Sequence, residues 1–171
     1  MSENNSISAS GIKTVAEIIE KYVDKLIAIK DSQRKKEELA RIHSLLDRVR
    51  QVRTANVELP MIAEHFWDDQ SNFAGEEFDI FFDKIESGIT NIEMLVDRIA
   101  TSHDQIVLED NEAFQELANA ARGRIRLSQG LRAAIADRDR QKYDRLFENY
   151  IFLSNRLGEM SFRVAEAAKK I

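Results

Sequence analysis

Residues 76–99 read EEFDIFFDKIESGITNIEMLVDRI, and this stretch decides the fold class. Its apolar side chains recur every three or four residues, which is the spacing of one face of an α-helix. They are Phe78, Phe81, Phe82, Ile85, Ile89, Ile92, Leu95, Val96 and Ile99. Three carboxylates, Glu76, Glu77 and Asp79, open the stretch, where negative charge stabilises the positive end of a helix. The pattern predicts a long amphipathic helix that ends near Thr101.

Helical spacing also marks the segments before this stretch. Thr14-Val-Ala-Glu17 has the form of a capping box, which predicts that the first helix begins there. The apolar pattern lapses over residues 31–38, so either Ser32 caps a second helix or one helix continues through a solvated stretch. Pro60 suits the first turn of a short helix near residues 60–67.

Two further helices are expected towards the C-terminus. Asp110 or Asn111 is placed to cap a helix whose inner face extends to Ile135, and Asp137–Asp139 marks a tight turn into a last helix. A connection this short makes those two helices antiparallel neighbours. No window long enough for a strand alternates apolar and polar residues. The chain is therefore predicted to be all-α, an antiparallel helical bundle of four or five long helices plus one short helix near residues 60–67.

The length and the amino-acid composition limit the class of protein. The chain has 171 residues, of which 43% are hydrophobic and 32% charged, and this is enough to bury one core. We expect a flexible N-terminal tail over residues 1–10 and a single helical-bundle domain over residues 11–171. Cysteine is absent, which excludes disulfides and thiolate metal sites. The sequence contains no secretory signal and no long apolar run, so a cytoplasmic protein without a membrane partner is expected.

Charge is segregated along the chain. Residues 58–118 carry 2 bases and 16 acids, a net charge of −14, whereas residues 30–57 carry +4 and residues 119–145 carry +5. We call residues 58–118 the acidic third of the chain. Within it, residues 64–83 combine seven carboxylates with six of the 13 aromatic residues. So much charge of one sign opposes folding by self-repulsion, and a cationic partner would offset that cost.

This acidic, aromatic segment predicts a non-enzymatic protein-binding module, such as an inhibitor, an immunity protein or an adaptor. Its partner would be another protein with a basic face, for example a toxin or a nucleic-acid enzyme. At least one exposed ring would anchor the partner, and the surrounding carboxylates would steer it. The expected contact residues are Trp67, Phe73, Asp68, Asp69, Glu76 and Glu77. The competing interpretation is that Phe66 and Trp67 form a lid over one end of the bundle, and self-association of the chain also stays open.

A nucleic-acid-associated protein is the first alternative. The arginine-rich segment 122–145 offers the clustered cations that phosphate binding needs. Its expected contacts fall on two helical faces, one with Arg122 and Arg126 and one with Arg138, Lys142 and Arg145. The sequence pI of about 5.3 argues against nucleic acid as the partner. The basic segments can instead pack beside the acidic third and neutralise it.

A bundle metalloenzyme at His65 is the second alternative. The di-iron sites of helical bundles use Glu-x-x-His pairs, and no histidine of this chain has a glutamate three residues before it. Ser102-His103-Asp104 cannot act as a catalytic triad within one helix, because adjacent side chains point apart. We therefore expect no enzymatic activity, no metal and no cofactor.

Overall fold

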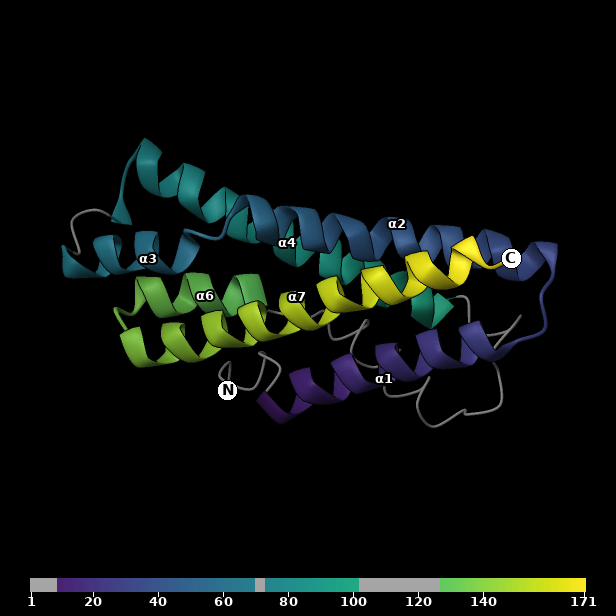
Figure 1. Ribbon diagram of the computed structural model, residues 1–171. Helices are drawn as coiled ribbons and strands as arrows, with labels where there is room; N and C mark the ends of the chain where they lie inside the picture. The colour runs from purple at the N-terminus through teal and green to yellow at the C-terminus, as the bar shows by residue number, and fades with distance from the viewer. Residues whose placement is uncertain (1–8, 70–72, 102–126) are drawn as a thin grey trace.

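The computed structural model describes residues 9–69, 73–101 and 127–171. Every regular element in these ranges is helical, which confirms the all-α bundle (Figure 1). The helices are α1 (Ala9–Ala28), α2 (Gln33–Ala55), α3 (Leu59–Asp68), α4 (Glu76–Thr101), α6 (Leu127–Ala136) and α7 (Arg140–Lys169). None of the helices in the described ranges is long and apolar enough to cross a membrane.

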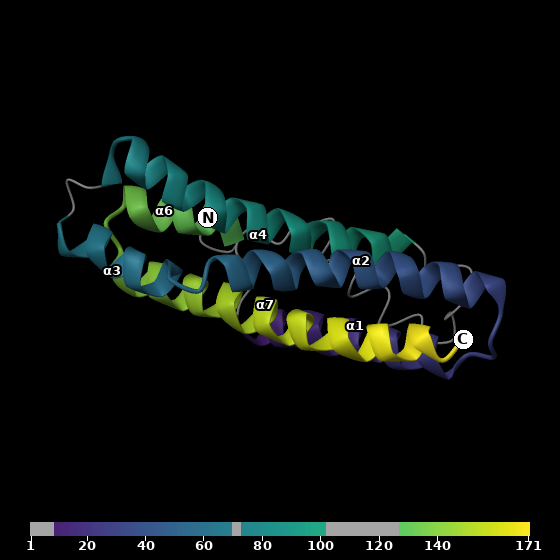
Figure 2. The same cartoon turned by 45° about the horizontal axis from the view of Figure 1, so that its top comes forward.

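Most neighbouring helices run antiparallel. The helix α2 lies between α4 and α7 and is antiparallel to both, while α6 folds back along the first half of α7 (Figures 1 and 2). By contrast, α1 runs in the same direction as α7. Two ion pairs show this directly, since Arg156 of α7 pairs with Glu20 and Arg163 pairs with Asp24 further along both helices. The short α3 lies at the end of the bundle opposite the C-terminus.

Capping residues explain where several helices begin. The hydroxyl of Ser32 accepts a hydrogen bond from the backbone N–H of Lys35 (3.1 Å), so Ser32 caps a second helix, and residues 29–32 separate it from α1. The carboxylate of Asp139 accepts from the backbone N–H of Lys142 (3.0 Å) in the same way. Pro60 occupies the first turn of α3, where its missing N–H has no consequence.

One prediction about the N-terminal part of the chain is wrong. The first helix begins at Ala9 and not at Thr14, although Thr14 and Glu17 fit a capping box. Ile12 is buried in the core (1% exposed), and this tertiary contact favours an additional helical turn before Thr14. The helix α1 therefore includes residues 9 and 10. The predicted cap at Asp110 or Asn111 lies outside the described residues.

The six helices of the described ranges all contribute to one apolar core, and two charged side chains of these ranges are buried beside it. The ammonium of Lys35 donates to the backbone carbonyls of Ile27 and Ile29, each at 2.7 Å, and so completes the C-terminal end of α1. It also pairs with Asp31 at 2.9 Å. The second buried charge, Glu38, accepts hydrogen bonds from Tyr22 of α1 and Arg98 of α4.

The glycine at position 88 allows a close approach between α4 and α7. A Cβ atom there would lie 2.8 Å from Cζ of Tyr150 and would collide with its hydroxyl oxygen. By contrast, a Cβ atom on Gly158 would meet the side chain of Arg50 at 3.5 Å, an ordinary van der Waals distance. Only the first of these glycines is required by packing.

Candidate functional site

The aromatic residues of α3 close one end of the bundle. Phe66 and Trp67 are 3% and 6% exposed. The Trp67 ring packs edge-on against Phe73 (4.7 Å between centroids) and against Tyr143 of α7 (5.3 Å). The Phe66 ring packs against Phe78 at the start of α4 (5.4 Å). The structure thus agrees with the lid interpretation, and Trp67 cannot be the exposed anchor that was expected of it.

Phe73 is half-buried, and one face of its ring is covered by the chain itself. The guanidinium of Arg138 lies 4.8 Å from the ring centroid, a cation–π contact. Arg138 has a positive φ of 54° in the turn before α7 and donates a hydrogen bond to the carbonyl of Ile135 (3.0 Å). It therefore does not share a helical face with Lys142 and Arg145, and that prediction is wrong. Arg122 and Arg126 lie outside the described residues.

Some carboxylates of the acidic third form ion pairs with arginines of α6 and α7. Glu64 of α3 accepts a hydrogen bond from Arg140, which raises the pKa of that guanidinium. Glu86 of α4 accepts a hydrogen bond from Arg132 Nε at 2.7 Å. The basic segment around α6 and α7 therefore neutralises part of the acidic third, as the competing interpretation of that segment proposed.

Other carboxylates, at the start of α4, form no ion pair within the described residues. Glu76, Glu77, Asp79 and Asp83 are exposed, and none of the four forms an ion pair with a residue that the structure describes. We call these four residues the acidic rim. Three of them occupy the first turn of α4, where the positive end of the helix dipole stabilises them. The expected contacts Asp68 and Asp69 are also exposed, at the end of α3.

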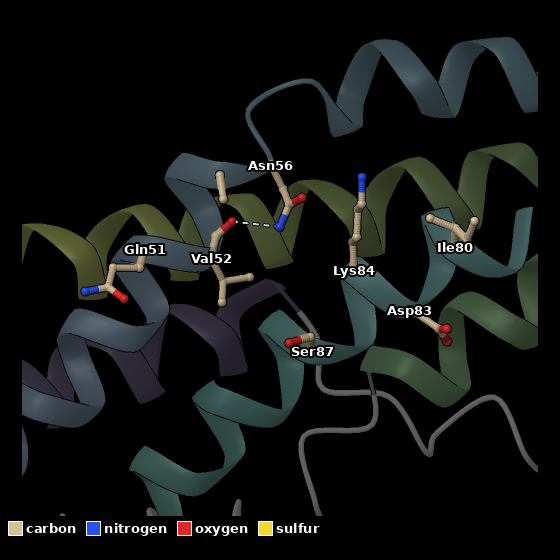
Figure 3. Close-up of a pocket in the computed structure, with 8 residues that line it drawn as sticks. Gln51, Val52, Asn56, Ile80, Asp83, Lys84 and Ser87 are labelled. Carbon is tan, nitrogen blue, oxygen red and sulfur yellow. Dashed lines mark hydrogen bonds between the residues drawn. The ribbon is translucent and has the colours of Figure 1, made fainter. Parts of the chain in front are cut away.

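An open groove of about 530 Å³ lies beside the acidic rim, between the last turns of α2 and the first half of α4 (Figure 3). Its lining residues are Gln51, Val52, Ala55 and Asn56 of α2 and Ile80, Asp83, Lys84 and Ser87 of α4. The side-chain amide of Asn56 donates to the carbonyl of Val52 (2.9 Å), so the end of α2 is internally bonded. We refer to this feature as the α2–α4 groove.

Two residues of the acidic rim, Glu76 and Asp83, share one face of α4 with the groove. Glu76, Ile80, Asp83 and Ser87 are spaced four, three and four residues apart, so they lie in a row along that helix. The Ile80 side chain is 51% exposed within this row. Lys84 is the one base among the residues that line the groove.

Sequence reasoning missed this groove. In the sequence Val52 continues the apolar spacing of Leu46 and Val49, but it is only half-buried and lines the groove. A usable signal was present in α4, because Ile80 is a large apolar residue outside the stripe that Phe78, Phe81 and Phe82 define. An apolar side chain on the polar face of an amphipathic helix is a candidate contact residue.

No metal site is evident around the histidine that the sequence singled out. His65 is exposed on α3 and contacts Phe66 edge-on at 5.6 Å, so it does not point into the bundle core as a di-iron ligand does. Within residues 9–69, 73–101 and 127–171, no three His, Asp or Glu side chains cluster closely enough to hold a metal ion.

Comparison with known proteins gives no family. No protein-family model, curated protein or solved structure matches this chain. Function is therefore inferred from the two features described above, the aromatic lid and the α2–α4 groove. Of these, the groove is the one that is open to solvent.

Proposed function

We propose that this protein is a non-enzymatic binding module that engages a basic protein partner through the α2–α4 groove and the acidic rim. An inhibitor, an immunity protein or an adaptor in the cytoplasm would each act in this way, by covering a positively charged surface of its partner. The observation that carries the proposal is the set of four exposed carboxylates without a cation in the described part of the chain, adjacent to the exposed side chain of Ile80.

The contrast within the acidic third supports this proposal. Glu64 and Glu86 pair with arginines of α6 and α7, whereas the four carboxylates of the acidic rim form no ion pair within the described residues, and one of them, Asp83, lines the groove beside α2. Uncompensated like charges cost stability by mutual repulsion. A positively charged partner would offset that repulsion, and long-range attraction would increase its association rate.

The internal contacts of the basic segment argue against the nucleic-acid alternative. Three arginines of the basic segment are engaged internally, Arg132 with Glu86, Arg138 with Phe73 and Arg140 with Glu64. A phosphate backbone approaching the groove would also meet the carboxylates of the acidic rim, which repel it. We therefore do not propose nucleic acid as the partner.

The test is affinity capture from the native cell with the immobilised protein at about 0.05 M and 0.5 M salt, which changes the screening length severalfold. Each captured protein is then purified and titrated against a rim variant, Glu76→Gln/Glu77→Gln/Asp79→Asn/Asp83→Asn. The control variant neutralises four exposed acids elsewhere: Glu17→Gln, Asp137→Asn, Glu148→Gln and Glu159→Gln.

We expect a basic partner that binds the wild type and the control variant, and that loses affinity for the rim variant and at high salt. A partner whose affinity is the same for the rim variant and for the wild type would overturn the proposal. So would a partner that binds independently of ionic strength.

A further inference from the structure

We infer that the segment occupying the α2–α4 groove is an amphipathic α-helix of the partner, with apolar side chains on one face and lysines or arginines grouped at its C-terminal end. This inference rests on the proposed function and specifies the structure of the partner. It follows from the backbone, the lining and the charge distribution of the groove, which are taken in turn.

The walls of the groove favour a helical occupant. Both walls are the sides of α-helices, whose backbone groups are bonded within α2 and α4. An extended peptide gains affinity from main-chain hydrogen bonds to a sheet edge, and the described helices offer none. Polyproline segments dock in aromatic-lined grooves, and no lining residue is aromatic. A helix satisfies its own backbone, so it needs only the side-chain surface that the groove provides.

The dimensions suit a short helix. From Ile80 to Ser87 the groove follows seven residues of α4, about 10 Å at the rise of an α-helix. Extending it to Glu76 in the acidic rim gives about 17 Å, equal to roughly three turns of a bound helix. Apolar contacts would come from Val52, Ala55 and Ile80, so the partner needs apolar residues about one turn apart.

The charge distribution sets the direction of the bound helix. The first turn of α4 places carboxylates at the end of the groove where Ile80 lies, whereas Gln51 and Ser87 at the opposite end are uncharged. The C-terminal end of a helix is its negative end and is itself stabilised by lysine and arginine. A helix with C-terminal basic residues over the acidic rim satisfies both requirements, and such a helix runs antiparallel to α4.

The same charges argue against a second copy of this chain as the occupant. In a two-fold symmetric dimer the same patch of both copies is buried, so both acidic rims would enter one interface. The described part of the groove contributes only Lys84 as a counter-charge. The partner is therefore a different protein with basic residues at this surface.

The test uses synthetic peptides of about 14 residues, which is roughly 21 Å as a helix. The first contains leucines at helical spacing and lysines grouped in its last turns. The second is a scrambled peptide of the same composition, the third has the lysines grouped in its first turns, and the fourth replaces lysine with glutamate. Dissociation constants are measured at low salt for the wild type, for the rim variant and for groove variants.

We expect the first peptide to bind at least about tenfold more tightly than the scrambled and reversed peptides, and the glutamate peptide not to bind. Ile80→Ser should weaken only the first peptide, whereas Met94→Ser should have no effect because Met94 is a comparably exposed residue of α4 outside the groove. Ala55→Lys adds a repelling cation at an exposed position and should also abolish binding. Circular dichroism confirms that each variant is folded.

The outcomes separate the two proposals. If the scrambled peptide binds as tightly as the first and both depend on the acidic rim, the helical occupant is wrong and the basic-partner proposal survives. If the reversed peptide binds equally well, the inferred direction is wrong. If no lysine peptide binds better than the glutamate peptide at low salt, both the inference and the proposed function are overturned.

Discussion

The guanidinium of Arg98 donates a 2.6 Å hydrogen bond to the carboxylate of Glu38, although Glu38 is only 4% exposed. The other oxygen of this carboxylate accepts a hydrogen bond from the hydroxyl of Tyr22 (3.1 Å). The residues come from α2, α4 and α1, so one buried charge joins three helices. Because α2 and α4 also form the groove, this contact helps to fix the relative position of its two walls.

Replacing Arg98 should therefore be costly. Arg98→Gln leaves the carboxylate of Glu38 buried with only the more distant Arg41 (3.8 Å) as a cation, and we expect the free energy of unfolding to fall by about 3 kcal/mol. Urea unfolding of Arg98→Gln, Glu38→Gln and the double variant measures the coupling. The double variant should lose less than the two single variants combined. Simple additivity would show that the pair is not energetically linked.

Lys35 should contribute to stability through hydrogen bonds rather than through surface charge. Lys35→Met leaves the carbonyls of Ile27 and Ile29 without their donor, and we expect a loss of about 1–3 kcal/mol in thermal or urea unfolding. The neighbouring Lys36 is exposed, so Lys36→Met should change stability by less than about 0.5 kcal/mol. Equal effects of the two substitutions would contradict the capping role of Lys35.

Gly88 of α4 and Gly158 of α7 offer a matched comparison. Gly88→Ala places a methyl group against the ring of Tyr150, and we expect a loss of about 1–3 kcal/mol from overpacking between α4 and α7. Gly158→Ala meets Arg50 at ordinary contact distance and should be neutral or stabilising by up to about 1 kcal/mol, because alanine has the higher helix propensity. Chemical unfolding of both variants is the measurement, and a stabilising Gly88→Ala would refute the close approach.

Tyr143 should make folding sensitive to alkaline pH. Burial, with a smaller contribution from Asp144, raises the pKa of its phenol above the usual value near 10, and burial also raises the pKa of Tyr150. Below about pH 10 both tyrosines are neutral in the folded and unfolded chains, so stability does not change. Above that pH the unfolded chain releases protons that the folded chain retains, and the free energy of unfolding falls.

A single substitution tests this reading of Tyr143. Its hydroxyl is buried and has no hydrogen-bond partner in the described residues. We expect Tyr143→Phe to raise stability by about 1 kcal/mol at neutral pH and to weaken the loss above about pH 10. Denaturation followed by circular dichroism from pH 7 to 12 measures both effects. A less stable Tyr143→Phe would mean that the hydroxyl makes a favourable interaction after all.

Elements with strong local signals could be predicted from the sequence, and contacts between distant elements could not. The stripe from Phe78 to Ile99 placed α4 almost to the residue, because its periodicity and its acidic first turn agree. The same reasoning placed α1 too late, since the burial of Ile12 depends on other helices. The burial of Trp67 could not be predicted from the local sequence either, because its ring packs against Tyr143, which is 76 residues away in the sequence.

The sole tryptophan of the chain lies where three helices meet, and this gives the molecule an intrinsic optical reporter. Its indole contacts Phe73 before α4 and Tyr143 in α7. Its fluorescence emission therefore depends on the position of α3 relative to these two rings. The connection from α2 into α3 starts at Asn56, which also lines the groove. A change in emission when a ligand is added would show, without any label, that occupation of the groove is transmitted to this end of the molecule.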